Sequence, residues 1–290
     1  MSTNKDTIDI LILGAGWTST FLIPLLKESK ISYAATTRAG SETTLPFTFD
    51  PKSSDPAPFA SLPSARTVLI TFPILGAGGS SLLVSLYTST HSGAAKPNFI
   101  QLGSTGIWTS RGLSSRHTPP DPANQRGIAE DELLSLGGAV LNLAGLWGGT
   151  RDPRNWVARI AKNKEEMAEK GSLHLIHGRD VARVVVAVHT TFSPGERWLV
   201  TDLRIYDWWD LASAWDEGSE PSQAAVKPGG EYVERGRHAR WVKQLMLDRN
   251  IVSLPRSLGE MNTRGLDSLM FWSTYGIMPS RALVTRLAPE

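Results

Sequence analysis

The stretch Ile8–Phe21, IDILILGAGWTSTF, decides the fold because it joins an apolar run to an apolar helical pattern through Gly14-Ala15-Gly16. We interpret it as a strand, a tight turn and a helix. Glycine suits such a turn because it adopts backbone angles that a Cβ forbids and lets a phosphate approach the amides. The helix that follows directs unpaired N–H groups and partial positive charge at that phosphate. The stretch therefore predicts a dinucleotide site.

Five residues of this turn are the expected contacts of the dinucleotide, and they are Gly14, Gly16, Trp17, Thr18 and Ser19. The G-x-G-x-x-G fingerprint has its third glycine where this chain has Ser19, so two of the three glycines are present. An ordinary strand-to-helix turn also uses such glycines. Strand-helix alternation behind the turn favours the nucleotide site.

Composition bounds the class of protein. The chain has 290 residues, 41% of them hydrophobic and 20% charged, which suits one large α/β domain or a nucleotide-binding domain with a smaller cap. It has no cysteine, which excludes disulfides, thiolate catalysis and cysteine-ligated zinc. The net charge is +2 without a basic run, and no apolar run reaches the roughly 20 residues that span a bilayer. We expect a cytoplasmic protein that binds neither nucleic acid nor membrane.

The end of the second expected strand, Tyr33–Thr37, predicts which cofactor binds. In this architecture that strand end faces the adenosine ribose, where an acidic residue would select NAD. The chain has Thr37 and Arg38 there instead. A guanidinium pairs with a 2′-phosphate, so we predict NADP rather than NAD; a solvated surface arginine is the alternative.

Further apolar runs predict the rest of a parallel sheet. Expected strands are Phe47–Asp50, Thr67–Ile74, Asn98–Leu102, Ala139–Ala144 and Trp198–Thr201. The predicted fold class is α/β, a Rossmann-type doubly wound parallel sheet with a smaller C-terminal substrate-binding part. We expect residues 1–150 to form the dinucleotide-binding core. Residues 151–290 complete the sheet at about 172–202 and form the cap, with a loop at 216–230.

Two polar segments of the chain are candidates for chemistry. Gly103-Ser104-Thr105-Gly106 follows a buried strand, at the sheet edge where ligands bind. It lacks the G-x-S-x-G spacing of a serine hydrolase. His174 and His177 lie three apart in a strand pattern and so face opposite sides, and we therefore expect no metal site. We expect the helix that begins near His177 to be capped by Asp180.

Taken in order, these landmarks resemble the extended and atypical branches of the short-chain dehydrogenase/reductase superfamily, which includes the nucleoside-diphosphate-sugar epimerases. The resemblance covers nearly the whole chain. Its carriers are Gly14-Ala15-Gly16, Thr37-Arg38, Thr71-Phe72-Pro73, Ser104-Thr105-Gly106-Ile107-Trp108, Ala129-Glu130, Leu143-Ala144-Gly145-Leu146-Trp147-Gly148 and His177–Val181. The resemblance implies that Pro73 also contacts the cofactor.

The resemblance also implies catalytic roles. In that family a Ser or Thr after the fifth strand hydrogen-bonds the reacting oxygen, and the next helix supplies a Tyr acid/base with a Lys four residues later. Ser104 and Thr105 fit the first role. If Glu130 matches the glutamate that follows the lysine, Arg126 takes the lysine position and Pro122 the tyrosine position, so the Tyr-x-x-x-Lys motif is not retained.

This departure changes the expected chemistry. Arg126 keeps the positive charge and the cofactor ribose contact, but a guanidinium does not act as a base. His117, in the loop before the helix, is our candidate replacement for the proton donor; a solvated histidine is the alternative.

We expect an NADP-dependent oxidoreductase, or an epimerase- or dehydratase-like enzyme, acting on a small carbonyl, sugar-like or specialised-metabolite substrate. Two alternatives stay open. One is a catalytically degenerate NADP-binding sensor or scaffold, and the other is a non-redox enzyme on the same fold. A homodimer is compatible with the sequence.

Overall fold

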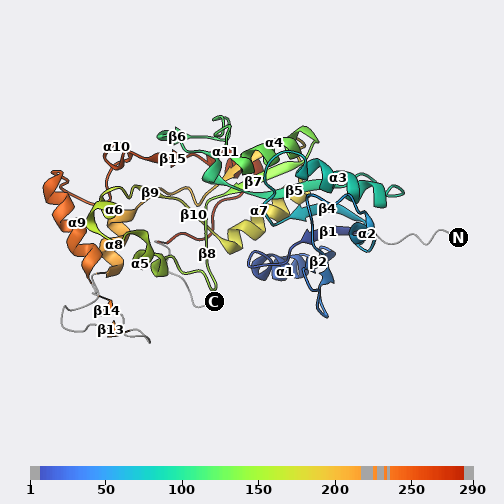
Figure 1. Ribbon diagram of the computed structural model, residues 1–290, viewed down its shortest axis with the longest axis horizontal. Helices are drawn as coiled ribbons and strands as arrows, with labels where there is room; N and C mark the ends of the chain where they lie inside the picture. The colour runs from blue at the N-terminus through green and yellow to red at the C-terminus, as the bar shows by residue number, and fades with distance from the viewer. Residues whose placement is uncertain (1–6, 217–224, 227–231, 234–235, 284–290) are drawn as a thin grey trace.

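The main sheet has seven parallel strands (Figure 1). The computed structural model describes residues 7–216, 225–226, 232–233 and 236–283. From one edge to the other, the strands are β3 (Leu45–Pro46), β2 (Tyr33–Thr37), β1 (Ile8–Leu13), β4 (Ala65–Ile70), β5 (Asn98–Ser104), β7 (Ala139–Leu143) and β11 (Arg197–Val200). The order confirms the predicted Rossmann-type α/β fold, with its topological switch between β1 and β4.

Alternation along β1 shows why the sheet is covered on both faces. Ile10 and Ile12 contribute to one apolar cluster, and Leu11 and Leu13 to another, because successive side chains of a strand point to opposite faces. The first cluster includes residues of helices α1 (Ser19–Glu28), α7 (Gly178–Thr190) and α11 (Leu269–Tyr275). The second includes residues of α2 (Ala57–Ala60), α3 (Gly79–Thr90) and α4 (Gln125–Ser135). The sheet is therefore doubly wound.

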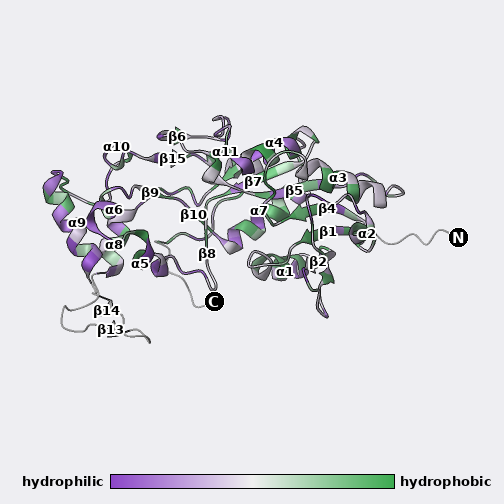
Figure 2. Ribbon diagram, viewed as in Figure 1, coloured by the Kyte–Doolittle hydropathy of each residue, from purple (hydrophilic) through white to green (hydrophobic). Residues whose placement is uncertain are grey.

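The later part of the chain forms a smaller body at one end of the molecule (Figure 1). Its helices are α5 (Val157–Ile160), α6 (Lys164–Ala168), α8 (Trp208–Asp216), α9 (Arg237–Asp248) and α10 (Leu258–Met261). Trp209 is completely buried among them, and the Arg256 guanidinium lies 3.7 Å from the centre of its ring. Figure 2 shows mostly hydrophilic residues on α9 and hydrophobic ones along the main sheet. The smaller body thus has its own apolar core.

Short strand pairs lie outside the main sheet. They are β8 (Gly145–Trp147) with β10 (Leu175–His177), β9 (Ser172–Leu173) with β12 (Tyr206–Asp207), β6 (Gly112–Ser114) with β15 (Arg264–Leu266), and β13 (Ala225–Val226) with β14 (Tyr232–Val233). Within 172–202, only β11 joins the main sheet. Most of the loop expected at 216–230 lies outside the described residues.

Two local expectations are wrong. The third strand is β3, Leu45–Pro46, and not Phe47–Asp50, because the ladder ends with the bond from Phe47 N–H to Thr37 O (2.9 Å) and the Phe47 and Phe49 rings then pack on Phe59. Helix α7 is capped by His177 rather than Asp180. Its Nδ1 accepts the Arg179 N–H at 3.1 Å.

Candidate functional site

The turn after β1 requires glycine at its first position. Gly14 has φ +93°, and a Cβ added there would lie 2.8 Å from Thr71 Oγ1. The Gly14 N–H donates to Thr36 Oγ1 at 3.0 Å, so β2 and β4 hold the turn from either side. At Gly16 a Cβ would meet no atom within 4 Å. This second glycine leaves open space where a ligand can approach the main chain.

The N-terminus of α1 has main-chain donors to offer. Thr18 is the N-cap residue, and its side chain makes no capping hydrogen bond. Among the described residues, no acceptor takes the amide hydrogens of Gly16, Trp17 and Thr18. Three consecutive amides at a helix N-terminus form a site for an anion such as a phosphate. The turn therefore fits the pyrophosphate of a dinucleotide.

A cavity of about 590 Å³ opens in front of this turn, and we call it the glycine cavity. Five of the predicted cofactor contacts line it together: Gly14, Gly16, Thr37, Arg38 and Pro73. The other lining residues are Ala15, Phe47, Thr48, Phe49, Thr71 and Phe72.

The aromatic wall of the glycine cavity was not predicted as a site. The rings of Phe49 and Phe72 lie 6.1 Å apart with an interplanar angle of 25°. Arg38 is exposed, as expected for a residue that would meet a ligand from solvent. The cavity thus combines main-chain amides, the phenylalanine rings of its wall and one guanidinium.

The remaining predicted residues of the turn do not line the cavity. The Trp17 ring faces the other way, because its Nε1 donates to Gly148 O at 3.2 Å and the Arg151 guanidinium lies 4.4 Å from the ring centre. Ser19 is buried, and its Oγ has no hydrogen-bond partner among the described residues. Trp17 and Thr18 can contact a cofactor there through their amides.

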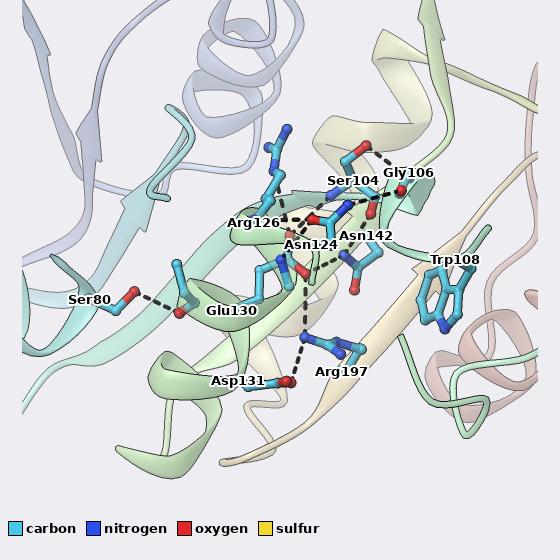
Figure 3. Close-up of polar contacts among 12 residues, drawn as sticks. Ser80, Ser104, Gly106, Trp108, Asn124, Arg126, Glu130, Asp131, Asn142 and Arg197 are labelled. Carbon is cyan, nitrogen blue, oxygen red and sulfur yellow. Dashed lines mark hydrogen bonds and ion pairs between the residues drawn. The ribbon is translucent and has the colours of Figure 1, made fainter. Parts of the chain in front are cut away.

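A second cavity, of about 280 Å³, lies at the carboxyl end of β5, and we call it the serine cavity. It is lined by Ser104, Thr105, Gly106, Leu143, Ala144, Gly145, Ser172, Leu173, His174 and Arg264. Ser104 Oγ accepts the Gly106 N–H at 3.1 Å, as Figure 3 shows. That bond uses an oxygen lone pair and leaves the Ser104 hydroxyl hydrogen for a ligand.

A cluster of polar side chains surrounds the buried Glu130, close to Ser104 (Figure 3). Asn142 Nδ2 donates to Glu130 Oε2 at 2.7 Å, and the Ser104 N–H donates to Oε1 at 3.3 Å. Arg126 Nε lies 3.5 Å from Oε1, and Arg197 Nη2 lies 3.4 Å from Oε2. Burial raises the pKa of Glu130, while its donors and the two guanidinium groups oppose that rise. The carboxylate thus ties helix α4 to the end of β5.

Pro122 and Arg126 occupy the positions that the resemblance assigns to the tyrosine and the lysine. Helix α4 begins at Gln125, capped by Asn124 Oδ1, so Pro122 precedes the helix. Arg126 Nη2 donates to Leu102 O at 2.9 Å, which places its guanidinium against β5. Arg126 therefore keeps a cation beside β5 and Glu130, and it is not among the residues that line the glycine cavity or the serine cavity.

His117 lies in an exposed turn, where its N–H donates to Ser115 Oγ at 3.2 Å. It is not among the residues that line the two cavities described here. Its role as proton donor stays a prediction.

His174 and Arg264 are candidate site residues that the sequence analysis missed. Arg264 Nη1 donates to Thr105 O at 2.9 Å and also to Trp108 O, and burial lowers its pKa. His174 Nε2 accepts the Leu266 N–H at 3.1 Å. Burial, and then the charge of Arg264, lower the pKa of His174 to about 4. His174 does stand apart from His177, which caps α7, as the strand pattern predicted.

In the described part of the chain, no group of three or more His, Asp or Glu side chains is arranged to hold a metal ion. Within residues 7–283, their undescribed gaps aside, no helix is both long and apolar enough to cross a bilayer.

Comparison with known proteins gives matches of structure alone. No protein-family model matches the chain, and no curated protein sequence matches it significantly. A dTDP-glucose 4,6-dehydratase from Bacillus anthracis, in complex with NAD, has a TM-score of 0.62 at 11% identity over 95% of this chain and 92% of that one.

Two other solved structures are similar to the same degree. Vestitone reductase from alfalfa has a TM-score of 0.62 at 15% identity, over 96% of this chain and 94% of that one. The UDP-glucose 4-epimerase of Thermus thermophilus, in complex with NAD, has a TM-score of 0.62 at 13% identity, over 95% of each chain. The chain therefore has, over nearly its whole length, the fold that this dehydratase, this reductase and this epimerase share.

Proposed function

We propose that the protein is an NADP-dependent oxidoreductase, or an epimerase- or dehydratase-like enzyme, that acts on a small carbonyl-containing or sugar-like substrate. One observation carries the proposal. The glycine cavity and the serine cavity open at the carboxyl ends of neighbouring parallel strands, β1, β2 and β4 for the first and β5 and β7 for the second. This edge is where open α/β sheets bind their ligands.

The glycine cavity suits NADP. The amides of Gly16, Trp17 and Thr18 would hold the pyrophosphate, and Arg38 would pair with the 2′-phosphate. Phe49 and Phe72 offer faces on which a flat base can stack. A bound nicotinamide cofactor supplies or accepts a hydride. The dehydratase and epimerase structures hold NAD, so the preference for NADP rests on Arg38 alone.

The serine cavity suits the substrate. The Ser104 hydroxyl would donate a hydrogen bond to the reacting oxygen, with Thr105 beside it. Arg126 stays protonated and would contact the cofactor ribose rather than move a proton.

The experiment measures binding and turnover separately. The purified protein is titrated with NADPH and with NADH by fluorescence, and a panel of aldehydes, ketones and nucleotide sugars is then screened for a change at the nicotinamide absorbance band. We expect tighter binding of NADPH and turnover of at least one carbonyl compound.

A catalytically degenerate NADP sensor is the second candidate, favoured by the missing tyrosine. Tight NADPH binding without turnover across the panel would support the sensor. Absence of binding by either cofactor would contradict both candidates.

A further inference from the structure

His174 lines the serine cavity, and the function proposed above gives it no role. It lies between β9 and β10 and lines the cavity together with Ser104, Thr105 and Arg264. The residue is 5% exposed, so it belongs to the cavity wall and not to the outer surface.

One hydrogen bond fixes the tautomer of this ring. The main-chain N–H of Leu266 donates to His174 Nε2 at 3.1 Å, so Nε2 must carry a lone pair. A neutral imidazole has one hydrogen, which is therefore on Nδ1. Protonation would set an Nε2–H against the Leu266 N–H, and it would add a second cation beside Arg264. The fold thus holds the ring neutral.

Nδ1 is the free end of the ring. The described residues provide no hydrogen-bond partner for it, and it is not among their buried side-chain atoms that lack a partner. We therefore infer that Nδ1 faces the cavity that His174 lines. A donor placed in this way can be satisfied by water or by a ligand oxygen.

We propose that His174 is a catalytic residue that binds the reacting oxygen of the substrate through Nδ1–H while the ring stays neutral. This inference rests on the proposed function of the serine cavity. The Ser104 hydroxyl is the second donor to the same oxygen, and the charge of Arg264 favours an oxygen that carries negative charge. The ligand class is a carbonyl compound, whose oxygen gains charge when its carbon is reduced.

The role is binding and polarisation: the hydride would come from the reduced cofactor and the proton that completes the alcohol from solvent water, so the histidine keeps its proton. A neutral imidazole is a hydrogen-bond donor, and losing its remaining hydrogen would leave an anion in a buried wall. His174 would in this way supply the hydrogen bond that a tyrosine hydroxyl would otherwise make.

The first test examines the ring itself. Protein labelled with ¹⁵N-histidine is titrated from pH 8 to pH 5.5, and the His174 signals are assigned by their loss in His174→Gln. We expect a proton on Nδ1 and a bare Nε2 throughout. A ring that carries its proton on Nε2, or that is charged at pH 6, would overturn the proposal.

The second test uses 4-(dimethylamino)cinnamaldehyde, whose absorbance moves to longer wavelength when its carbonyl oxygen accepts strong hydrogen bonds. The probe is added with NADP in the oxidised form, so that it is not reduced. We expect the shift in the wild type and in His174→Gln, whose amide can accept from Leu266 N–H and still donate. We expect its loss in His174→Leu. An equal shift in His174→Leu, or none in the wild type, refutes the role.

Kinetics separate this inference from the proposed function. For the best carbonyl substrate, His174→Leu should lower kcat/KM about 100-fold with the Kd for NADPH unchanged. The matched control is His189→Leu, because His189 is also buried but bonds Thr67 Oγ1 (2.8 Å) outside both cavities. Activity of His174→Leu within twofold of the wild type overturns the inference and leaves the proposed function standing. A probe shift that depends on His174, in a protein that turns over no substrate, would support the role of His174 and contradict the proposed enzymatic function.

Discussion

The glycine cavity and the serine cavity are built in different ways. The glycine cavity is formed by four short segments, at the ends of β1, β2, β3 and β4. The serine cavity takes Ser104, His174 and Arg264 from segments that lie far apart in the chain. A cavity of the first kind depends on local backbone geometry, and one of the second kind on tertiary packing.

The interactions that stabilise the two cavities differ as well. The turn of the glycine cavity is held by bonds between main-chain and threonine atoms, such as Gly14 N–H to Thr36 Oγ1. The serine cavity rests on the buried carboxylate of Glu130 and the cations around it. Side-chain charges buried in this way are costly to unpair, so the serine cavity should be the easier of the two to break.

The largest effect should follow from Glu130→Leu. This change leaves Arg126 without its carboxylate, and it removes one of the two acceptors of Asn142 Nδ2 and the acceptor of the Ser104 N–H. Breaking a buried ion pair from one side costs about 3–5 kcal/mol, so the free energy of unfolding in urea should fall by that amount.

Asp131→Leu is the matched control for that change. Asp131 lies on the same helix and pairs with the same Arg197 at 3.0 Å, but its side chain is 58% exposed. An exposed ion pair contributes about 1 kcal/mol or less. Equal losses of stability in the two variants would contradict the account of the Glu130 cluster.

A somewhat smaller effect should appear as a dependence of stability on pH. The pKa of His174 is about 4 in the folded protein, against 6.5 for a free histidine. Between these values the unfolded chain binds more protons than the folded protein, so the free energy of unfolding decreases as the pH falls from 6.5 to 4. The decrease due to this residue is about 3 kcal/mol.

The contribution of His174 is measured by difference. Urea unfolding of the wild type and of His174→Gln is compared at pH 7 and at pH 4, because the variant lacks the titrating ring. The wild type should lose about 3 kcal/mol more than the variant on acidification. If the wild type and the variant lost the same free energy of unfolding between pH 7 and pH 4, the pKa of His174 would be the same in the folded and the unfolded chain.

Much of the fold could be predicted because its signals are local. Ile10–Leu13 in β1 form an apolar run buried on both faces, all five residues of β7 are buried, and the glycines of the first turn are two residues apart in the sequence. The short edge strand β3 was misplaced, since a two-residue pairing leaves no pattern. His177 was not expected as a cap because histidine is seldom one.

The residues of the serine cavity were harder to predict. Ser104 and Thr105 were found from their place after a buried strand. Arg264 was not, because nothing in the sequence indicates that β15 pairs with β6 and brings its guanidinium to Thr105. The sequence analysis weighs His174 only as a metal ligand. Its place in the serine cavity could not be predicted, because the hydrogen bond that fixes its tautomer comes from a main-chain N–H 92 residues away.

The preference for NADP should depend on Arg38 alone. Arg38→Asp removes the predicted partner of the 2′-phosphate and places a negative charge there. A charge-assisted hydrogen bond contributes about 1.5–3 kcal/mol, so the Kd for NADPH should rise roughly tenfold to a hundredfold, with little change for NADH. Lys52→Asp is the control, because it makes the same change of charge at an exposed residue that does not line the glycine cavity. Equal weakening of NADPH and NADH by Arg38→Asp would refute the phosphate contact.

The smallest effects are expected at the two glycines of the turn, where Gly14→Ala and Gly16→Ala should behave differently. Gly14→Ala forces φ +93° on a residue with a Cβ and brings that Cβ to 2.8 Å from Thr71 Oγ1, so we expect a loss of about 1–2 kcal/mol in the free energy of unfolding. Gly16→Ala meets no atom within 4 Å and should unfold like the wild type. Its methyl group nevertheless enters the space where the phosphate is expected, so its Kd for NADPH should rise. Stability is measured by urea unfolding and affinity by fluorescence titration. If Gly16→Ala bound NADPH as tightly as the wild type, the pyrophosphate would not lie against the amides of Gly16, Trp17 and Thr18, and these amides would not contribute to cofactor binding.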